Sequence, residues 1–295
     1  MSTSFSKVSI SMSDNFKKTV FITGASSGIG RITSLYLCEK GYKVIGSSRK
    51  LSRLDAINEQ ANTRGKCFYP VELDINLNFG EKGCIEEVIP KLISEHSRID
   101  VLVNNAGYGL WGPIEGISVS EMENQFKTNV FAPFRLSKMV IPSMRNQGFG
   151  RIINISSVAG WVATPFNGAY ASSKFALEAQ TEALRMELWP FGVTVSSIQP
   201  GLFDTDFQSN MVQGTDAESD KLPYTYLIDR YRKKHKKWRK VIRNPIRISK
   251  LIERIIDADK PRLRYPIGFE ARAGMIGSKI FPERIYQWMI SRISM

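Results

Sequence analysis

The stretch Thr23-Gly24-Ala25-Ser26-Ser27-Gly28-Ile29-Gly30 lies directly after a short apolar run, residues 19–23, and opens a helical pattern over residues 28–40. Glycines in such a turn let the backbone approach a pyrophosphate closely and let the helix pack on the strand. The N-terminus of the helix adds unpaired N–H groups and the positive end of the helix dipole. The motif therefore predicts a dinucleotide-binding turn. Its alternative interpretation is a tight turn with a purely structural purpose.

Beyond this motif the chain alternates short β-branched runs with longer helical patterns, as βαβ units do. The expected strands are residues 19–23, 43–45, 67–69, 100–103, 151–155 and 193–198, with an edge strand at 263–265. The expected helices are residues 28–40, 51–63, 81–97, 118–146 and 167–189, then one capped by Asn244 with Pro245 in its first turn, and one at 282–293. Right-handed crossovers place such helices on both faces. We therefore expect an α/β, doubly wound fold with one parallel sheet of about seven strands.

The chain contains no Pro/Gly/Ser-rich linker that would divide it. We expect one domain over residues 19–295, preceded by a flexible N-terminal arm, residues 1–18, that is rich in serine and other polar residues. The domain would include a substrate lid at about 205–243 and a C-terminal helix at about 282–293.

The charge of the chain is concentrated at one end. Its 295 residues contain 41 basic and 28 acidic side chains, a net charge of +13. Residues 221–295 hold 20 of the basic and 6 of the acidic side chains, which leaves 21 and 22 in residues 1–220. A uniformly basic surface would indicate nucleic-acid binding. Because the surplus lies at one end, we do not expect a nucleic-acid partner.

Cysteine and histidine usage argues against disulfide or metal frameworks. The three cysteines form no CxxC pair and are odd in number, and the chain has only two histidines. We expect no metal site.

No apolar run approaches the roughly 18 residues of a membrane span. We therefore expect a cytoplasmic protein, with peripheral contact to a membrane surface as an open alternative.

The end of the second expected strand indicates which dinucleotide binds. In proteins that bind NAD, an acidic residue at this position usually accepts a hydrogen bond from the ribose 2′-OH. The 2′-phosphate of NADP instead requires that this acid be absent and that a basic residue lie nearby. This strand ends Gly46-Ser47-Ser48-Arg49-Lys50, so Ser48 leaves room and Arg49 offers a bidentate fork to phosphate. We expect NADP(H) to be preferred and NAD(H) to remain usable. The alternative is an exposed basic turn.

Tyr170-Ala-Ser-Ser-Lys174, with Ser156 and Ser157 upstream, is a candidate acid/base constellation. Four residues make about one helical turn, so Tyr170 and Lys174 share a face. A fixed ammonium beside a phenol stabilises the phenolate and is expected to lower the tyrosine pKa from about 10. A hydroxyl from the preceding strand end would hold the substrate oxygen. The alternative is a solvated helix face.

Taken together, these motifs resemble the short-chain dehydrogenase/reductase family over about residues 17–205, and the tail resembles its 17β-hydroxysteroid dehydrogenase-like members that use NADP. The resemblance is carried by residues 23–30, Asp74, residues 104–107, Lys127-Thr-Asn129, Ser157, residues 170–174 and residues 200–205. It implies a Rossmann fold, oxidoreductase activity and a homodimer or homotetramer packed through residues 118–146 and 167–189.

The resemblance also implies the roles of individual residues. The catalytic tetrad would be Asn129, Ser157, Tyr170 and Lys174, with Ser157 chosen over Ser156 because of its spacing from Tyr170. The expected cofactor-binding residues are Gly24, Ser26, Ser27, Gly28, Ile29, Gly30, Ser48, Arg49, Asp74, Asn105, Ala106, Gly107, Tyr170, Lys174, Pro200, Gly201 and Thr205. Asn105 and Asp74 also admit a purely structural interpretation.

Aromatic and apolar residues flank these motifs and are expected to line the substrate pocket. They are Trp111, Trp161, Phe166, Phe203 and Phe207, together with Val162 and Met211. Such a lining favours a bulky lipophilic alcohol or carbonyl, similar to a steroid, retinoid or lipid, although several of these residues fit a core equally well. Fold-level similarity does not identify the substrate.

The lid contains the basic run Arg230-Tyr-Arg-Lys-Lys-His-Lys-Lys-Trp-Arg-Lys240, with apolar residues at helical spacing. Such a helix either covers the pocket with its apolar face or lies on an anionic membrane surface. The leading hypothesis is therefore an NADP(H)-dependent oxidoreductase. The alternative is a non-catalytic NADP(H)-binding scaffold that uses its basic lid to bind RNA, a membrane or a protein partner.

Overall fold

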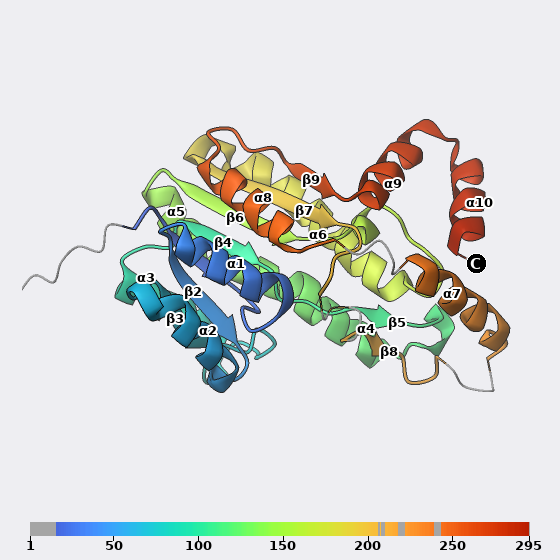
Figure 1. Ribbon diagram of the computed structural model, residues 1–295, viewed down its shortest axis with the longest axis horizontal. Helices are drawn as coiled ribbons and strands as arrows, with labels where there is room; N and C mark the ends of the chain where they lie inside the picture. The colour runs from blue at the N-terminus through green and yellow to red at the C-terminus, as the bar shows by residue number, and fades with distance from the viewer. Residues whose placement is uncertain (1–15, 206, 208–209, 218–221, 239–242, 295) are drawn as a thin grey trace, which may run out of the picture.

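A seven-stranded parallel sheet forms the centre of the computed structural model, which describes residues 16–205, 207, 210–217, 222–238 and 243–294 (Figure 1). The strand order is β3-β2-β1-β4-β6-β7-β9. The strands are β1 (Thr19–Ile22), β2 (Lys43–Ser48), β3 (Phe68–Glu72), β4 (Val101–Asn104), β6 (Gly150–Ile155), β7 (Val193–Pro200) and β9 (Arg264–Ile267). The order reverses between β1 and β4, and this switch point is where ligands bind in doubly wound folds. The predicted fold class is confirmed.

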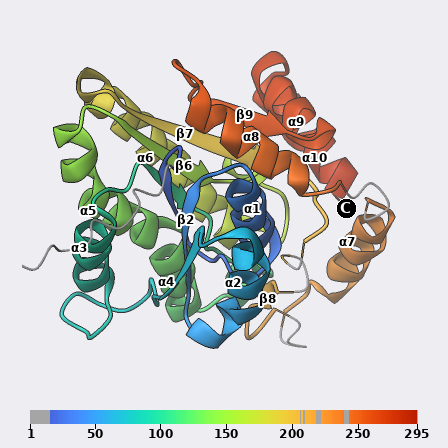
Figure 2. The ribbon, with the colours of Figure 1, turned by 60° about the vertical axis from the view of Figure 1, so that its left-hand side comes forward.

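Helices cover both faces of the sheet. The α-helices in the described part of the chain are α1 (Gly28–Glu39), α2 (Asp55–Ala61), α3 (Ile85–His96), α4 (Val119–Phe126), α5 (Ala132–Asn146), α6 (Gly168–Leu188), α7 (Thr225–Trp238), α8 (Ile246–Asp257), α9 (Phe269–Ile280) and α10 (Glu283–Ser294). Side chains of α1, α2 and α8 form the core on one face, and those of α3, α5 and α6 form the core on the other. Figure 2 shows the sheet between these two sets of helices.

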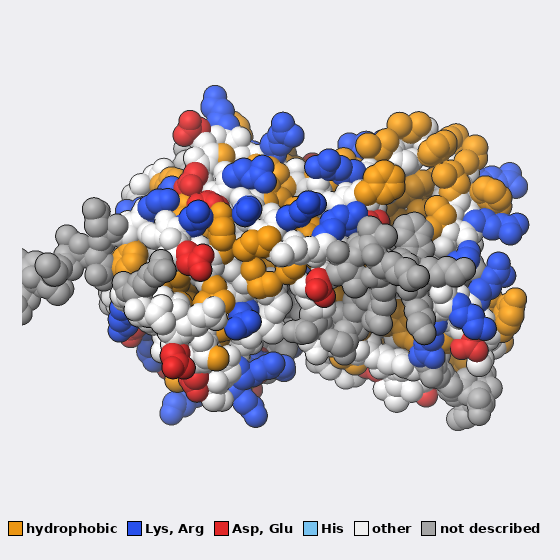
Figure 3. Space-filling model, viewed as in Figure 1, with side chains coloured by type: hydrophobic (Ala, Val, Ile, Leu, Met, Phe, Trp, Pro, Cys, Tyr) orange, Lys and Arg blue, Asp and Glu red, His pale blue; other side chains and the backbone are white. Residues whose placement is uncertain are grey.

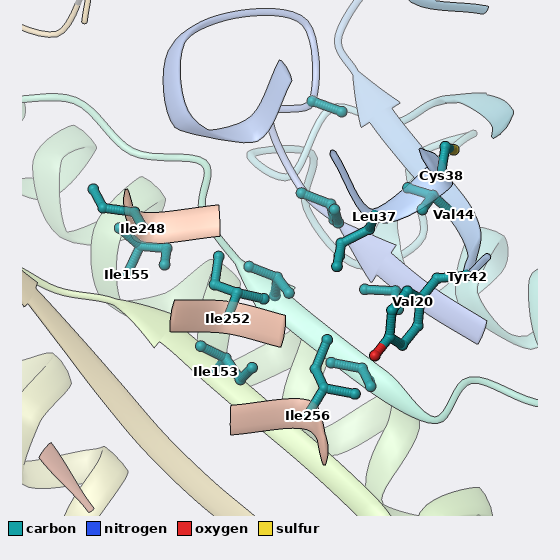
Figure 4. Close-up of a cluster of buried hydrophobic side chains, with 14 of the residues drawn as sticks. Val20, Leu37, Cys38, Tyr42, Val44, Ile153, Ile155, Ile248, Ile252 and Ile256 are labelled. Atoms are coloured by element: carbon teal, nitrogen blue, oxygen red, sulfur yellow. The ribbon is translucent and has the colours of Figure 1, made fainter. Parts of the chain in front are cut away.

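Helix α8 joins the C-terminal part of the chain to the central core. Ile248, Ile252 and Ile256 of α8 pack toward Ile153 and Ile155 of β6 (Figure 4). All five are buried, and the β-branched side chains of Ile153 and Ile155 suit a strand buried on both faces. The basic C-terminal third therefore contributes to the same hydrophobic core as the glycine motif.

Several elements differ from those expected. The long helix expected over residues 118–146 is interrupted by a π-helical turn, Lys127–Phe131, and α8 begins at Ile246, where Asn244 Oδ1 accepts from the Ile246 N–H at 2.9 Å. The sequence did not predict α9, or the two-stranded sheet of β5 (Leu110–Trp111) and β8 (Val212–Gln213). Most of the expected arm, residues 1–18, lies outside the described residues.

The C-terminal helices α9 and α10 form a hairpin at one end of the molecule, beside α7 (Figure 1). Lys234 of α7 donates from its Nζ to the Arg292 carbonyl oxygen of α10. None of the helices in the described part of the chain is both long and apolar enough to cross a membrane.

Candidate functional site

The glycine turn joins β1 to α1 at the carboxyl edge of the sheet. Gly24 and Gly28 have φ values of +64° and +50°, a conformation that favours glycine. A Cβ atom on Gly30 would lie 2.3 Å from the Gly24 carbonyl oxygen, so no side chain fits there. The side chain of Ser27, the N-cap residue, makes no hydrogen bond to the first turn of α1. Thr205 packs against this turn, 3.6 Å from where a Gly28 Cβ would lie. The positive end of α1 is therefore open to an anion.

Asn105 fixes the shape of this turn from the end of β4. Its Nδ2 donates to the Thr23 carbonyl oxygen at 2.9 Å and to the Gly24 carbonyl oxygen at 3.2 Å. In return, the Thr23 hydroxyl oxygen accepts from the backbone N–H groups of Asn105 and Ala106, each at 3.0 Å. Two neighbouring strand ends are thereby held in one geometry at the switch point of the sheet.

The ends of β2 and β3 carry the residues expected to select the cofactor. Ser48 is buried at the end of β2, and residues 46–53 contain no acid. Arg49 and Arg53 lie on the same cavity wall as Ser48. The sequence reasoning missed Arg53, although its spacing of four residues from Arg49 was an available signal. After β3, Asp74 Oδ1 accepts from the Asn76 N–H at 2.9 Å, so this carboxylate also has a structural role.

Asn129 lies in the π-helical turn between α4 and α5. Its Nδ2 donates to the Tyr108 carbonyl oxygen at 3.0 Å and to Ser173 Oγ at 3.1 Å, and its Oδ1 accepts from the Tyr108 N–H at 3.2 Å. A Cβ atom on Gly107 would lie 3.0 Å from Asn129 Oδ1 and 3.8 Å from Lys174 Nζ. Glycine at position 107 therefore allows the end of β4 to approach both polar groups. π-Helical turns of this kind occur frequently at functional sites.

Ser157, Tyr170 and Lys174 converge where β6 ends and α6 begins. Ser157 Oγ accepts from the Ala159 N–H at 3.1 Å, and the Ser157 side chain also acts on the Tyr170 hydroxyl, whose pKa it lowers. Lys174 Nζ donates to the Ile155 carbonyl oxygen at 2.8 Å and lies 5.7 Å from the centre of the Tyr170 ring. The shared face predicted for Tyr170 and Lys174 is present, and it is buried.

Burial dominates the electrostatics of this group, contrary to the sequence expectation. Burial raises the pKa of Tyr170 to about 12, and the smaller, opposing effect of the Ser157 side chain does not offset this increase. Burial also lowers the pKa of Lys174 to about 8, while the negative charge of Glu178 opposes that decrease. The expectation that the pKa of Tyr170 lies below about 10 was wrong for this structure, because burial is the largest effect on this pKa and it raises it.

Most of these groups border one cavity of about 1490 Å³. The cofactor residues expected from the sequence that line it are Gly24, Ser26, Ser27, Gly28, Ile29, Ser48, Arg49, Asp74, Asn105, Ala106, Gly107, Tyr170, Lys174, Pro200, Gly201 and Thr205. Ser157 lines it too, whereas Gly30 and Asn129 lie behind this wall and act through their neighbours. The volume is larger than the 300–1,000 Å³ typical of a site for one small ligand.

The aromatic residues expected to line the substrate pocket divide into two groups. Phe203 and Phe207 lie on the cavity wall, as do Val162 and Met211, and the Phe207 ring is 5.5 Å from the Tyr170 ring. Trp111, Trp161 and Phe166 are absent from the wall, which corrects the expectation for these three. The ring of Trp161 instead lies under Arg264 and Lys279, at 4.9 and 5.6 Å.

Trp111 and Phe166 pack under α7 and not against the cavity. The Phe166 ring lies 5.5 Å from Tyr231 and 6.3 Å from Tyr224, and the Trp111 ring lies 6.1 Å from Tyr231. Ile228 and Leu227 complete this cluster. The apolar face of α7 therefore packs onto the protein, which favours the covering role over a membrane role for that face. The side chains of residues 235–238 lie outside the described part.

The helices α9 and α10 form a wall that the sequence reasoning did not assign in detail. Its lining side chains are Phe269, Ala273, Ile276, Phe281, Tyr286, Met289, Ile290 and Ile293, with Gly274 and Gly277 between them. Gly274 permits close packing, because a Cβ atom there would lie 3.0 Å from Val162. The available signal was the apolar spacing of residues 285–293.

Comparison with known proteins agrees with this geometry. The family model described as short chain dehydrogenase matches residues 18–216. The chain is 35% identical to retinol dehydrogenase 8 of Homo sapiens over 261 residues, which cover 84% of this chain and 80% of the relative. It is 41% identical to 3-ketodihydrosphingosine reductase of Bacteroides thetaiotaomicron over 191 residues, 65% of this chain and 66% of the relative.

A similar fold is found among solved structures. A short-chain dehydrogenase from Streptomyces avermitilis superposes with a TM-score of 0.79 at 30% identity, and the match covers 90% of this chain and 93% of that one. The similarity extends well beyond the residues that the family model matches. It therefore includes part of the basic C-terminal third.

Proposed function

This chain belongs to the short-chain dehydrogenase family, and from that premise we propose that it is an NADP(H)-dependent oxidoreductase that interconverts a secondary alcohol and a carbonyl on a bulky lipophilic substrate. One observation carries the proposal. Ser157, Tyr170 and Lys174 line the same cavity as the glycine turn, so a proton donor and a dinucleotide turn share one enclosed space. A pure binding scaffold has no need for this buried combination.

The residues present fit a dinucleotide. The turn at Gly24 and Gly30 has no space for side chains, and the open N-terminus of α1 suits a pyrophosphate. The Ser156 hydroxyl oxygen is buried next to the cavity without a hydrogen-bond partner, which costs free energy until a ligand satisfies it. When bound, NADP(H) supplies the hydride that is exchanged with the substrate carbon.

Cofactor selection is assigned to the end of β2. Ser48, Arg49 and Arg53 share one wall, and no acid accompanies them in residues 46–53. Two guanidinium groups and a small hydroxyl suit a 2′-phosphate, because arginine binds phosphate with paired, charge-assisted hydrogen bonds. We therefore propose NADP(H) as the preferred cofactor, with NAD(H) usable at lower affinity.

Proton transfer is assigned to Tyr170. Its pKa of about 12 keeps the phenol protonated at neutral pH, so in reduction it donates its proton to the carbonyl oxygen. Ser157, whose side chain lines the same cavity and lowers the pKa of that hydroxyl, would hold the carbonyl oxygen and stabilise its developing negative charge. Lys174 supplies a positive charge 5.7 Å from the ring centre and would hydrogen-bond the cofactor ribose. Asn129 would hold a water between Lys174 and solvent.

The proposed substrate class is supported by the apolar part of the cavity wall. Phe203, Phe207 and the apolar side chains of α9 and α10 face the space beside Tyr170. Burying such a surface against a substrate contributes about 25 cal/mol per Å² of apolar area. Two relatives carry the names of lipid-type substrates, retinol and 3-ketodihydrosphingosine. We therefore propose a retinoid-, steroid- or sphingoid-like carbonyl or alcohol.

We also propose that the chain forms a homodimer or homotetramer through α5, its preceding π-helical turn and α6. Phe131, Phe134 and Phe175 are large apolar side chains that these elements leave exposed. Aromatic residues in such positions are enriched at interfaces between subunits. The C2 symmetry common in homodimers would place the same patch on both partners.

A substrate panel tests the proposed function. Lipophilic ketones, aldehydes and alcohols, with sugars and amino acids as polar comparisons, are incubated with NADPH or NADH, or with their oxidised forms for the alcohols. The proposal predicts NADPH-dependent turnover of at least one lipophilic carbonyl and none of the polar compounds. Tight NADPH binding with no turnover of any compound would instead support the scaffold alternative.

A further inference from the structure

The hairpin α9–α10 leaves a large apolar surface exposed at the mouth of the cavity. Its exposed large side chains are Phe269, Ile276, Ile280, Phe281, Ile285, Trp288 and Ile293. Figure 3 shows hydrophobic side chains gathered over this end of the molecule. Contiguous exposed apolar surface of this kind marks an interaction site more often than it occurs on an ordinary monomer surface.

This surface continues into the cavity. Phe269, Ile276, Phe281 and Ile293 are exposed to solvent and also line the cavity wall, whereas Ile280, Ile285 and Trp288 lie outside that wall. An apolar path therefore leads from the outer face of the hairpin to the side chains around Tyr170. A lipophilic molecule following it would remain next to apolar side chains.

Basic side chains surround the apolar surface. The hairpin exposes four basic side chains, Arg272, Lys279, Arg284 and Arg292. It has two acidic side chains: Glu283 is exposed, and Glu270 is paired with Arg243 at 2.8 Å. Helix α7 adds the exposed basic side chains of Arg230, Arg232 and Lys233 against one exposed acid, Asp229. Lys234 links α7 to α10 by its hydrogen bond to the Arg292 carbonyl oxygen. The rim of the mouth is therefore positive.

We propose that the outer face of the α9–α10 hairpin docks on an anionic lipid bilayer, with the mouth of the cavity directed toward the membrane. A basic rim complements anionic headgroups, and the exposed side chains suit the boundary between headgroups and acyl chains. The same rim disfavours a symmetric contact with a second copy, because like charges would then face each other. The inference rests on the proposed function only in the nature of the molecule that enters the mouth.

The surface of α6 provides a matched control. Ile280 and Trp288 on the hairpin are 68% and 61% exposed, and Met186 and Trp189 at the end of α6 are 68% and 62% exposed. Both tryptophans also lie near an arginine, Arg292 at 5.7 Å and Arg185 at 5.8 Å. The α6 pair directly precedes β7 and so lies at the sheet edge opposite the cavity.

Co-sedimentation of the full chain with phosphatidylcholine vesicles, with and without phosphatidylserine, tests the proposal. We expect wild-type protein to bind the anionic vesicles and to release as salt screens the headgroups. The Ile280→Glu/Trp288→Glu double variant should bind at least about tenfold more weakly, and Met186→Glu/Trp189→Glu should bind as the wild type does. Equal loss in both variants, or no wild-type binding, would overturn the inference.

Two further measurements keep the outcomes separate. NADPH binding and turnover of a water-soluble carbonyl without vesicles should be equal in both double variants, because none of the four residues lines the cavity. Vesicle binding without any turnover would overturn the proposed function and leave the docking intact. Sedimentation velocity measures self-association of the wild type and of the hairpin variant. If the hairpin variant no longer self-associates and the wild type does not bind vesicles, the surface is an interface between copies of the chain and the proposal is wrong.

Discussion

Lys174 and Tyr170 lie one turn apart on α6, and the Lys174 Nζ is 5.7 Å from the centre of the Tyr170 ring while it donates to the Ile155 carbonyl oxygen at 2.8 Å. Both side chains are buried, so burial raises the tyrosine pKa to about 12 and lowers the lysine pKa to about 8. Tyr170 is therefore a protonated phenol at neutral pH, and the neighbouring Lys174 loses its positive charge near pH 8. This arrangement suits proton donation in the reductive direction.

Tyr170→Phe should remove this proton donor with little change to the packing. We expect kcat for carbonyl reduction to fall by about 10²–10⁴-fold, the usual contribution of a general acid. NADPH affinity, measured by fluorescence titration, should stay near that of the wild type. Tyr231→Phe is the control, because the Tyr231 ring packs against Trp111 and Phe166 and has no contact with Tyr170 among the ring contacts of the described residues, so this variant should retain turnover. Comparable activity in both variants would refute the assignment of Tyr170.

The pH dependence of reduction should follow Lys174. Below its pKa of about 8 the amine is charged, and above it the charge that stabilises the developing phenolate is lost. We therefore expect kcat/KM for NADPH to be flat from pH 6 to about 8 and to fall above it, since this parameter reports groups of the free enzyme. Tyr170, with a pKa of about 12, adds no limb in this range. A profile that rises through pH 8–9 is the contrary result.

Ser48→Asp should change the cofactor preference. An aspartate at the end of β2 repels the 2′-phosphate of NADPH and accepts from the ribose 2′-OH of NADH. The ratio of kcat/KM values should shift toward NADH by at least about tenfold, or about 1.4 kcal/mol. Ser52→Asp introduces the same charge at an exposed position away from the cavity wall and should leave the ratio nearly unchanged. Unaltered preference in Ser48→Asp would argue against the proposed phosphate site.

Ile252→Ala should destabilise the whole domain. Ile252 is fully buried in the core cluster that joins α8 to β6, and such a truncation costs about 2–5 kcal/mol of unfolding free energy. Ile114 is mostly exposed, so Ile114→Ala should change the unfolding free energy by at most about 0.5 kcal/mol. Urea unfolding in a single transition checks both values. A separate transition for residues beyond 243 would instead show an independent C-terminal unit.

The sequence predicted those parts of the site whose geometry is local. The glycine turn and the spacing of Tyr170 from Lys174 each depend on a few neighbouring residues, and the structure places them as expected. The pocket walls depend on packing between distant segments. The aromatic character of Trp111 and Phe166 suits a pocket wall as well as a core, and in the structure Tyr231 of α7 packs against both.

Other differences also have physical causes. The sign of the Tyr170 pKa shift depends on how completely the fold excludes water, which spacing along a helix does not reveal. Helix α9 went unpredicted because Gly274 and Gly277 weaken its helical pattern, although they permit contact with Val162 and Tyr286. Tertiary packing overrides local propensity at these positions.

Transfer of deuterium from NADPH that carries deuterium at both C4 positions of the nicotinamide tests the central claim most directly. Wild-type protein is mixed with labelled NADPH and a lipophilic ketone, and the alcohol product is examined by mass spectrometry. The account predicts one deuterium on the carbinol carbon and loss of product formation in Tyr170→Phe. Binding of NADPH without any labelled alcohol from a broad set of lipophilic carbonyls would contradict it.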